Sequence, residues 1–176
     1  IIDTKDFSTI IITMPVVIYE GPFFKNLFPL TYLRPTFELR IGLGTLIDNY
    51  KRFFNDSEIK SLTRCIFCKE EVKINKGPVL FLDGQFLIEQ KISLDGPEEV
   101  FIADGERVGF RKKIKPFPST VDEVTKVIKK IKARRLIKGK FLNFLWDFVG
   151  YNSEAILKSF EPKTSQGRCG RCVCIL

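Results

Sequence analysis

The stretch that decides the fold of this 176-residue chain is NLFPLTYLRPTFELRIG, residues 26–42. Two prolines, Pro29 and Pro35, prevent a continuous helix, because proline lacks the backbone N–H that an interior helical turn needs. The segment is nevertheless rich in apolar residues, so it predicts an ordered loop over residues 23–40 rather than a solvated linker. This loop presents the polar side chains of Thr31, Arg34, Glu38 and Arg40.

Short apolar runs on both sides of this loop predict strands. The first run, residues 15–19, ends at the turn Glu20-Gly21-Pro22. Four more strands are expected at residues 79–82, 86–88, 100–103 and 107–111, with a hairpin turn at Asp104-Gly105.

Three helices are expected, at residues 42–54, from Thr120 to about Ile137, and from Trp146 or Asn152 to Phe160. Thr120 followed by Glu123 has the spacing of a capping box. Because strands alternate with helices, the pattern predicts an α/β domain on a mainly parallel sheet.

Two loops follow strands whose carboxyl ends would lie at the ligand-binding edge of such a sheet. One follows residues 16–19, and the other is the turn at Asp83-Gly84. Arginine can grip a phosphate with two parallel hydrogen bonds, so Arg34 and Arg40 are candidate phosphate ligands. The alternative is an ion pair of Glu38 with either arginine, which would only pin the loop.

Composition places the chain among globular proteins and gives it a net charge of +8. Much of the excess lies in residues 111–115 and 126–140, where cations fall around several helical faces without interleaved aromatic residues. We therefore expect a solvated basic surface and regard nucleic-acid binding as unlikely. No apolar run is long enough for a membrane helix, and we expect a cytoplasmic protein without membrane contact.

The chain has no histidine, which excludes histidine metal sites and Ser-His-Asp triads. Five cysteines include two Cys-x-x-Cys pairs, Cys65 with Cys68 and Cys169 with Cys172. Two such pairs can hold zinc, but about 100 residues separate them here, far more than in a zinc ribbon. Zinc is therefore unlikely, and free thiols are the expected state.

At this point the sequence resembles a known family. PLTYLRPTFELRIG, residues 29–42, close behind a first strand, resembles the start of the GlmU-like sugar nucleotidyltransferase family. A second match is LWDFV, residues 145–149, followed by Asn152, Glu154 and Phe160. It resembles the Trp-Asp-Leu-Val motif, with its following Asn and helix, that closes the N-terminal domain of the family.

The resemblance implies a Rossmann-like three-layer sandwich of the nucleotide-diphospho-sugar transferase type. It implies binding of a nucleoside triphosphate and a sugar 1-phosphate, and formation of a nucleotide sugar with release of pyrophosphate. Arg34 and Arg40 would be catalytic cations, and Asp83 would be the Mg²⁺ ligand. The implied substrate-binding residues are Leu30, Thr31, Glu38, Trp146, Asp147 and Asn152.

The sequence also departs from the family pattern. Characterised pyrophosphorylases have a Gly-x-Gly-Thr-Arg loop, whereas residues 21–26 here are GPFFKN, with one glycine and a proline that has no N–H. Thr36 stands where a lysine is usual. A catalytically degenerate regulatory or scaffold domain is therefore the alternative function, and a small zinc-dependent nucleic-acid binder is a third.

The expected domain spans residues 14–160. Met14 is the only methionine, so residues 1–13 are expected to be a leader that is not native. Family members continue into a left-handed β-helix, so residues 161–176 are expected to be a loose tail that is cut short of it. The nucleotide, the sugar and the oligomeric state do not follow from the sequence.

Overall fold

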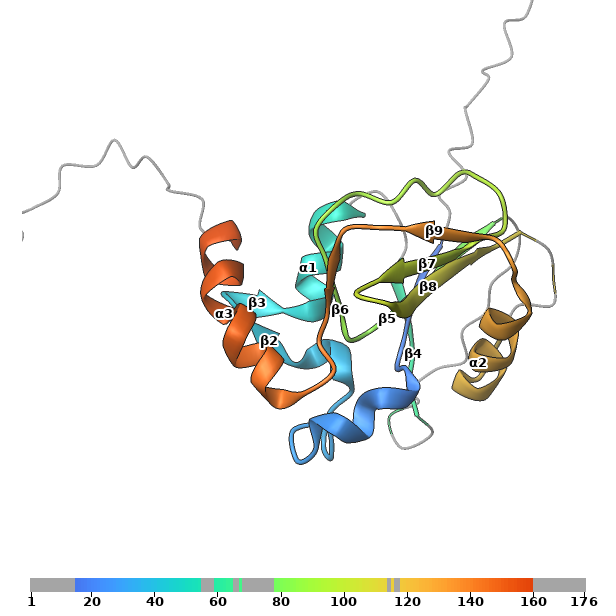
Figure 1. Ribbon diagram of the computed structural model, residues 1–176. Helices are drawn as coiled ribbons and strands as arrows, with labels where there is room; N and C mark the ends of the chain where they lie inside the picture. The colour runs from blue at the N-terminus through green and yellow to red at the C-terminus, as the bar shows by residue number, and fades with distance from the viewer. Residues whose placement is uncertain are drawn as a thin grey trace, which may run out of the picture.

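The computed structural model describes residues 15–54, 59–64, 67, 78–113, 115 and 118–159. Its centre is a six-stranded sheet in the order β4-β1-β5-β8-β7-β9 (Figure 1). The strands are β1 (Val16–Tyr19), β4 (Ile59–Leu62), β5 (Val79–Asp83), β7 (Val100–Ala103), β8 (Glu106–Lys112) and β9 (Arg134–Leu136). Only β8 runs antiparallel to its neighbours, so the predicted mainly parallel α/β sheet is confirmed.

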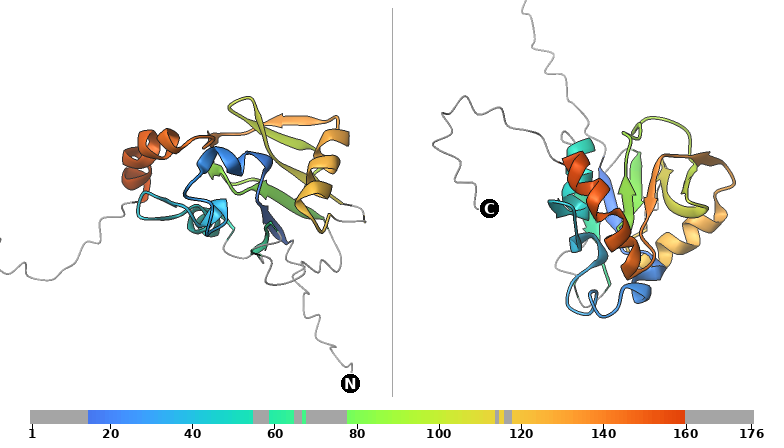
Figure 2. Two further views of the ribbon diagram at one scale, coloured as in Figure 1. Left: turned by 90° about the horizontal axis from the view of Figure 1, so that it is seen from below. Right: turned by 60° about the vertical axis from the view of Figure 1, so that its left-hand side comes forward.

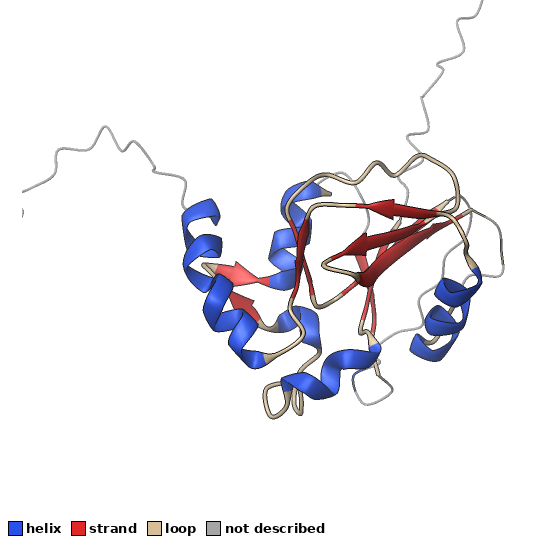
Figure 3. Ribbon diagram, in the orientation of Figure 1, coloured by secondary structure: helices blue, strands red, loops and turns tan. Residues whose placement is uncertain are grey.

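Alternating side chains of the central strands enter two separate cores, because successive residues of a strand point to opposite faces. Val16 and Ile18 lie in the larger core with helix α1 (Leu46–Phe53) and helix α3 (Leu145–Ser159). Val17 lies in a smaller core under helix α2 (Val121–Lys130). The sheet is thus covered on both faces, as Figures 2 and 3 show, which is the expected three-layer arrangement.

Two short ribbons and two 3-10 turns complete the described chain. The turns are η1 (Pro22–Leu27), which begins one residue before the predicted loop, and η2 (Thr36–Glu38), which lies inside it. The ribbons pair β2 (Arg40–Ile41) with β3 (Gly44–Thr45), and β6 (Phe86–Ile88) with β10 (Gly139–Phe141).

The predicted helix at residues 42–54 begins later than expected. Residues 40–45 form the β2–β3 hairpin, whose turn contains Gly42 at φ +63°, and the helix starts only at Leu46. Thr45 caps it, since its hydroxyl accepts the Asp48 N–H while the Asp48 carboxylate accepts the Thr45 N–H. The apolar spacing matched a helix, but the glycine and this capping box set the boundary.

The prediction of a helix from Thr120 to about Ile137 is half wrong. The helix α2 ends at Lys130, and Ile131 is already extended at φ −75° and ψ 121°. Strand β9 then adds to the edge of the sheet by pairing with β7, a partner 34 residues earlier. Such a long-range pairing overrides the local helical pattern.

The hairpin turn at Asp104-Gly105 is confirmed. Asp104 has φ +50° and Gly105 has φ +81°, as a type I′ turn requires at both central positions. The leader at residues 1–13, the tail at 161–176 and all five cysteines lie outside the described residues. Within the described part of the chain, no helix is long and apolar enough to cross a membrane.

Candidate functional site

Strands β1 and β5 end side by side, which brings two acidic residues to the carboxyl edge of the sheet. Tyr19 is in register with Asp83, and the Gly84 N–H donates to the Tyr19 carbonyl (2.7 Å). Glu20 follows Tyr19 directly, and both Glu20 and Asp83 are at most 1% exposed. Two buried carboxylates therefore lie where α/β sheets bind ligands.

Burial raises the pKa of Asp83 from 3.8 to about 7, because a charged carboxylate loses its hydration there. The negative charges of Glu20 and Glu106 raise it further. Backbone N–H groups of Gln85 (2.9 Å to Oδ1) and Gly21 oppose the rise by stabilising the ionised form. The carboxyl group thus titrates near neutral pH, as groups at functional sites often do.

Gly21 makes this close approach of loop and carboxylate possible. A Cβ atom added at Gly21 would lie 1.9 Å from Asp83 Oδ2. No side chain fits at that distance, so only glycine lets the loop cross directly over Asp83.

The buried Glu20 and the partly buried Arg64 form an ion pair that ties the loop to the end of β4. Arg64 Nε lies 2.8 Å from Glu20 Oε2, and Arg64 Nη2 donates to the Thr31 carbonyl (2.6 Å). Glu20 Oε1 also accepts the Thr36 N–H (3.2 Å). The guanidinium lies over the ring of Phe24, 4.1 Å from its centroid. Both ends of the loop are therefore held by one pair of charges.

Two buried oxygens at this edge lack a hydrogen-bond partner among the described residues. They are Thr36 Oγ1 and Gln85 Oε1, and both residues are 0% exposed. A Cβ atom at Gly84 would lie 2.7 Å from Thr36 Oγ1, so that hydroxyl sits against the Asp83-Gly84 turn. Buried polar atoms are almost always satisfied, and an orphan at a strand end calls for a water or a ligand.

Tyr50 on α1 contacts the backbone at the end of β5. Its hydroxyl lies 2.6 Å from the Asp83 carbonyl oxygen and 2.5 Å from that of Phe86, and it shares one proton between them. We expect Tyr50→Phe to lower the free energy of unfolding by about 1–3 kcal/mol, since two buried carbonyls would lose their donor. Urea denaturation measures this loss. A change below about 0.5 kcal/mol would show that water replaces the hydroxyl.

Four of the predicted site residues are exposed. Arg34, Glu38 and Arg40 make no side-chain hydrogen bond or ion pair with any described residue, and Leu30 is 50% exposed. The pinning ion pair of Glu38 with either arginine is therefore not formed. No described contact brings Arg34 or Arg40 to Asp83, so the structure leaves their phosphate role as a prediction.

Three other predicted residues make contacts within the fold. Thr31 is buried, and its hydroxyl donates to the Phe24 carbonyl (2.9 Å). Asn152 Oδ1 accepts the Gly42 N–H (2.8 Å), which joins α3 to the β2–β3 hairpin. Trp146 is 67% exposed and stacks on Phe144 at 4.5 Å.

Asp147 stands at the third position of α3, where its carboxylate accepts the N–H groups of Asn143 (2.9 Å) and Phe144 (2.8 Å). This is N-terminal capping, so Asp147→Ala should lower the free energy of unfolding by about 1 kcal/mol. Thermal and urea denaturation check it. Asp147→Asn is the control, because an amide oxygen can still accept one of these bonds, and equal losses in both variants would contradict capping.

A large groove lies elsewhere in the molecule, between α1 and α3. It has a volume of about 1380 Å³, and Ile88 and Ala155 are among its lining residues. Lys158 crosses its rim with ion pairs to Glu89 (2.6 Å) and Glu154 (2.7 Å). None of the residues of the Glu20–Asp83 edge lines it, and we place the candidate site at the edge because the perturbed carboxyl group is there.

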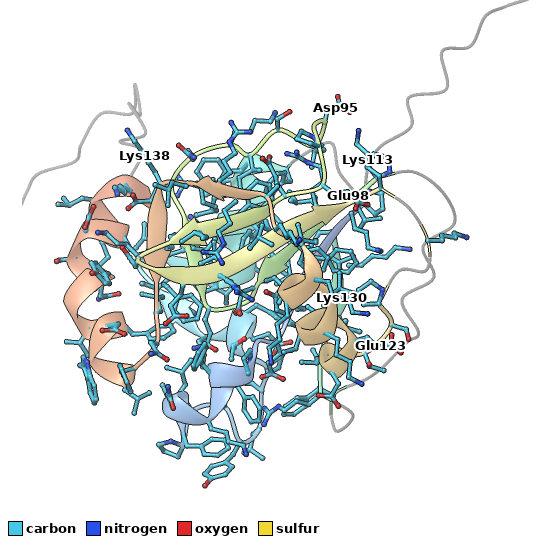
Figure 4. All side chains as sticks on the ribbon, turned by 45° about the vertical axis from the view of Figure 1, so that its right-hand side comes forward. Asp95, Glu98, Lys113, Glu123, Lys130 and Lys138 are labelled. Carbon is cyan, nitrogen blue, oxygen red and sulfur yellow. The ribbon has the colours of Figure 1, made fainter. Side chains whose placement is uncertain are left out.

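The basic segment does not form a single stripe. Residues 112–140 hold eleven Lys and Arg against two acidic residues, a net charge of +9, while the whole chain carries +8. In Figure 4, Lys130 lies on α2, Lys113 beyond the end of β8, and Lys138 towards the opposite side of the view. The cations are spread over several surfaces, which favours a solvated role.

The comparisons with known proteins agree with this fold. Residues 16–168 match the family model described as sugar nucleotidyl transferase. The chain belongs to this family. No curated protein sequence matches it. Among solved structures, it is similar to one from Bacillus anthracis, described as a glucose-1-phosphate thymidylyltransferase in complex with a sucrose. The two align over 85% of this chain and 98% of that one, with a TM-score of 0.50 and 9% identity, a likeness of fold alone.

The resemblance to GlmU-like enzymes implies a Mg²⁺ site at Asp83, and the donor set does not fit one. Asp83 is 1% exposed, and two backbone N–H groups already donate to its carboxylate. Glu20 is engaged by Arg64 and Thr36. Among the described residues, no group of three or more Asp, Glu, Cys or His side chains is arranged to hold a metal. We therefore derive no step through a metal ion.

The sequence patterns did not indicate the other residues of this edge site. Glu20 carries the same signal as Asp83, a carboxylate directly after a buried strand, but it was assigned to a turn. Gln85 follows the Asp83-Gly84 turn and could have been found by the same rule. Arg64 had no signal, because residues 59–62 show no strand pattern and a lone arginine carries no motif.

Proposed function

We propose that the chain is a GlmU-like domain that binds a nucleoside triphosphate and a sugar 1-phosphate at the Glu20–Asp83 edge. A phosphate oxygen of the sugar 1-phosphate would attack the α-phosphorus of the triphosphate. A new P–O bond forms, the bond to the β-phosphate breaks, and pyrophosphate leaves. Membership of the family supports the general reaction class, and the GlmU-like assignment rests on the two sequence motifs.

The observation that carries the proposal is the environment of the Asp83 carboxyl group at the carboxyl edge of the sheet. A buried carboxyl group with a pKa of about 7 stands beside two oxygens without partners, Thr36 Oγ1 and Gln85 Oε1. Buried polar atoms almost always have a hydrogen-bond partner, so two such oxygens beside a carboxyl group with a perturbed pKa indicate a place where a water or a ligand binds. A neutral Asp83 would also repel phosphate less than an ionised one, so the elevated pKa favours an anionic ligand.

The exposed arginines are the proposed phosphate ligands. The guanidinium groups of Arg34 and Arg40 lie on the loop and hairpin that follow β1 and make no hydrogen bond or ion pair with a described residue, and each can bind a phosphate with two hydrogen bonds. Reaching a triphosphate at the edge would require the loop to move, since no described contact joins these arginines to Asp83. Positioned cations would then neutralise charge that develops during phosphoryl chemistry.

We expect calorimetric titration to detect binding of UTP, dTTP or GTP. Arg34→Ala should lower the affinity for the bound nucleotide about tenfold, which corresponds to about 1.4 kcal/mol. Arg134→Ala is the matched control, because Arg134 is an exposed arginine on the edge strand β9. Equal affinity in both variants would remove Arg34 from the site. Failure of the folded wild-type protein to bind any nucleotide would overturn the proposal itself.

A catalytically degenerate domain is the second candidate. It is favoured by the loop after β1, which is a short 3-10 helix beginning at Pro22 rather than a glycine-rich phosphate cradle. This alternative predicts nucleotide binding without turnover. An assay of pyrophosphate release from triphosphate plus sugar 1-phosphate, with and without Mg²⁺, separates an active domain from a degenerate one. Release that Arg34→Ala abolishes would exclude the degenerate domain.

A further inference from the structure

The candidate site is closed in this structure. Asp83 is 1% exposed, and Thr36 and Gln85 are 0% exposed, so no ligand can touch their side chains as they stand. The first residue of the loop after β1 (residues 21–35), Gly21, lies against the Asp83 carboxylate. A ligand that reaches this carboxylate from the loop side must therefore displace the loop.

Arg64, from a distant part of the chain, contacts the loop at several points, beside the burial of Leu27 in the main core and the hydrogen bond of Asn26 to Asn143 (2.7 Å). Arg64 follows β4 and makes three kinds of contact with the loop side of the edge. It pairs with Glu20 (2.8 Å), donates to the Thr31 carbonyl (2.6 Å) and stacks on Phe24 (4.1 Å). Its side chain is 18% exposed and that of Glu20 is 0% exposed, so salt screens this pair less than it screens a surface pair.

The contacts fall at the start, the middle and the end of the loop. Glu20 precedes it, Phe24 and Thr31 lie within it, and Thr36, whose N–H Glu20 accepts, follows it. A loop that opens while Arg64 stays beside the end of β4 must break the Thr31 and Phe24 contacts together. We propose that Arg64 is the positioning residue that keeps the loop at residues 21–35 closed, and that release of this clamp controls access of the triphosphate to Asp83.

The substitution Arg64→Lys separates a positioning role from charge balance. Arg64→Lys keeps a cation beside the buried Glu20, so the fold is preserved. An ammonium on a flexible stem cannot bridge Glu20 and Thr31 in the fork geometry or stack flat on Phe24. Glu20→Gln is the second variant, since it keeps an acceptor for the Thr36 N–H and removes the ionic half of the clamp.

Hydrogen–deuterium exchange tests the clamp directly. We expect Arg64→Lys and Glu20→Gln to speed amide exchange at least tenfold in residues 23–36, with exchange in β5 and β8 unchanged. The control Arg134→Lys should leave the loop as in wild type. Unchanged loop exchange in both clamp variants would overturn the inference, and so would faster exchange spread evenly over the sheet.

Stopped-flow binding of a fluorescent UTP analogue tests access, and this part rests on the proposed function. We expect the association rate constant to rise several-fold in Arg64→Lys, because more molecules are open when the ligand arrives. An unchanged rate constant with a faster-exchanging loop would overturn the access step. If neither protein bound the analogue or unlabelled UTP, dTTP or GTP, the proposed function and the access step would both fail, while the exchange result alone would decide the clamp.

Discussion

Replacing Arg64 by alanine should lower the free energy of unfolding by about 3–5 kcal/mol, the cost of leaving a buried charge without its partner. The Glu20 side chain is 0% exposed, and Arg64 is the cation paired with it among the described residues. Removing the guanidinium also deletes the bond to Thr31 and the contact with Phe24. Urea denaturation at pH 7 measures the effect.

Two further variants identify the cause of that loss in stability. Arg134→Ala should cost no more than about 0.5 kcal/mol, as is usual for an exposed side chain. Adding Glu20→Gln to Arg64→Ala should restore part of the stability, because the uncompensated charge is then gone. A loss below about 1 kcal/mol in Arg64→Ala would show that Glu20 finds water or another donor.

Asp83 should make the protein less stable as the pH rises from about 4 to about 7. The folded carboxyl group has a pKa of about 7, whereas in the unfolded chain it returns to 3.8. Its contribution to stability is therefore fully present below pH 4 and is lost progressively until the folded pKa has been passed. A shift of this size corresponds to at most about 4 kcal/mol, at 1.36 kcal/mol per unit.

The measurement is the difference between wild type and Asp83→Asn across that range. Other carboxylates, such as Asp48, have lowered pKa values and push the pH dependence in the opposite direction, so the wild-type curve alone is not sufficient. The unfolding free energy of the wild type minus that of Asp83→Asn should fall by up to about 4 kcal/mol between pH 4 and pH 8. A constant difference would mean that Asp83 is ionised in the folded protein at pH 5.

The strands of the main sheet were the most predictable part of the fold. Residues 79–82 and 100–103 are buried on both faces, and strands of this kind are continuous apolar runs that turn residues delimit. β4 was not predicted, because it has no periodic pattern and is a strand only through its pairing with β1. β9 was mistaken for helix, because its pairing with β7 is invisible in local sequence.

The candidate site also has residues that the sequence predicted correctly and residues whose role only the contacts show. Asp83 was predicted because it ends a buried strand, and its location at the carboxyl edge is what the structure shows. Asp147 and Asn152 belong to a family-like motif, but their side chains bond to the backbone at the start of α3 and at the β2–β3 hairpin. A motif identifies residues that the fold uses, and contacts are needed to tell a cap from a ligand.

The sequence by itself determined the α/β class, the family resemblance and the proline-stiffened loop, since these follow from local patterns of apolar, turn and charged residues. Tertiary structure alone decided that Glu20 pairs with Arg64, that Gly21 lies on Asp83, and that this carboxyl group titrates near neutral pH. Glu20 and Arg64 are 44 residues apart. Such pairings, and the burial that shifts a pKa, depend on which strands become neighbours, and no short window of sequence contains that information.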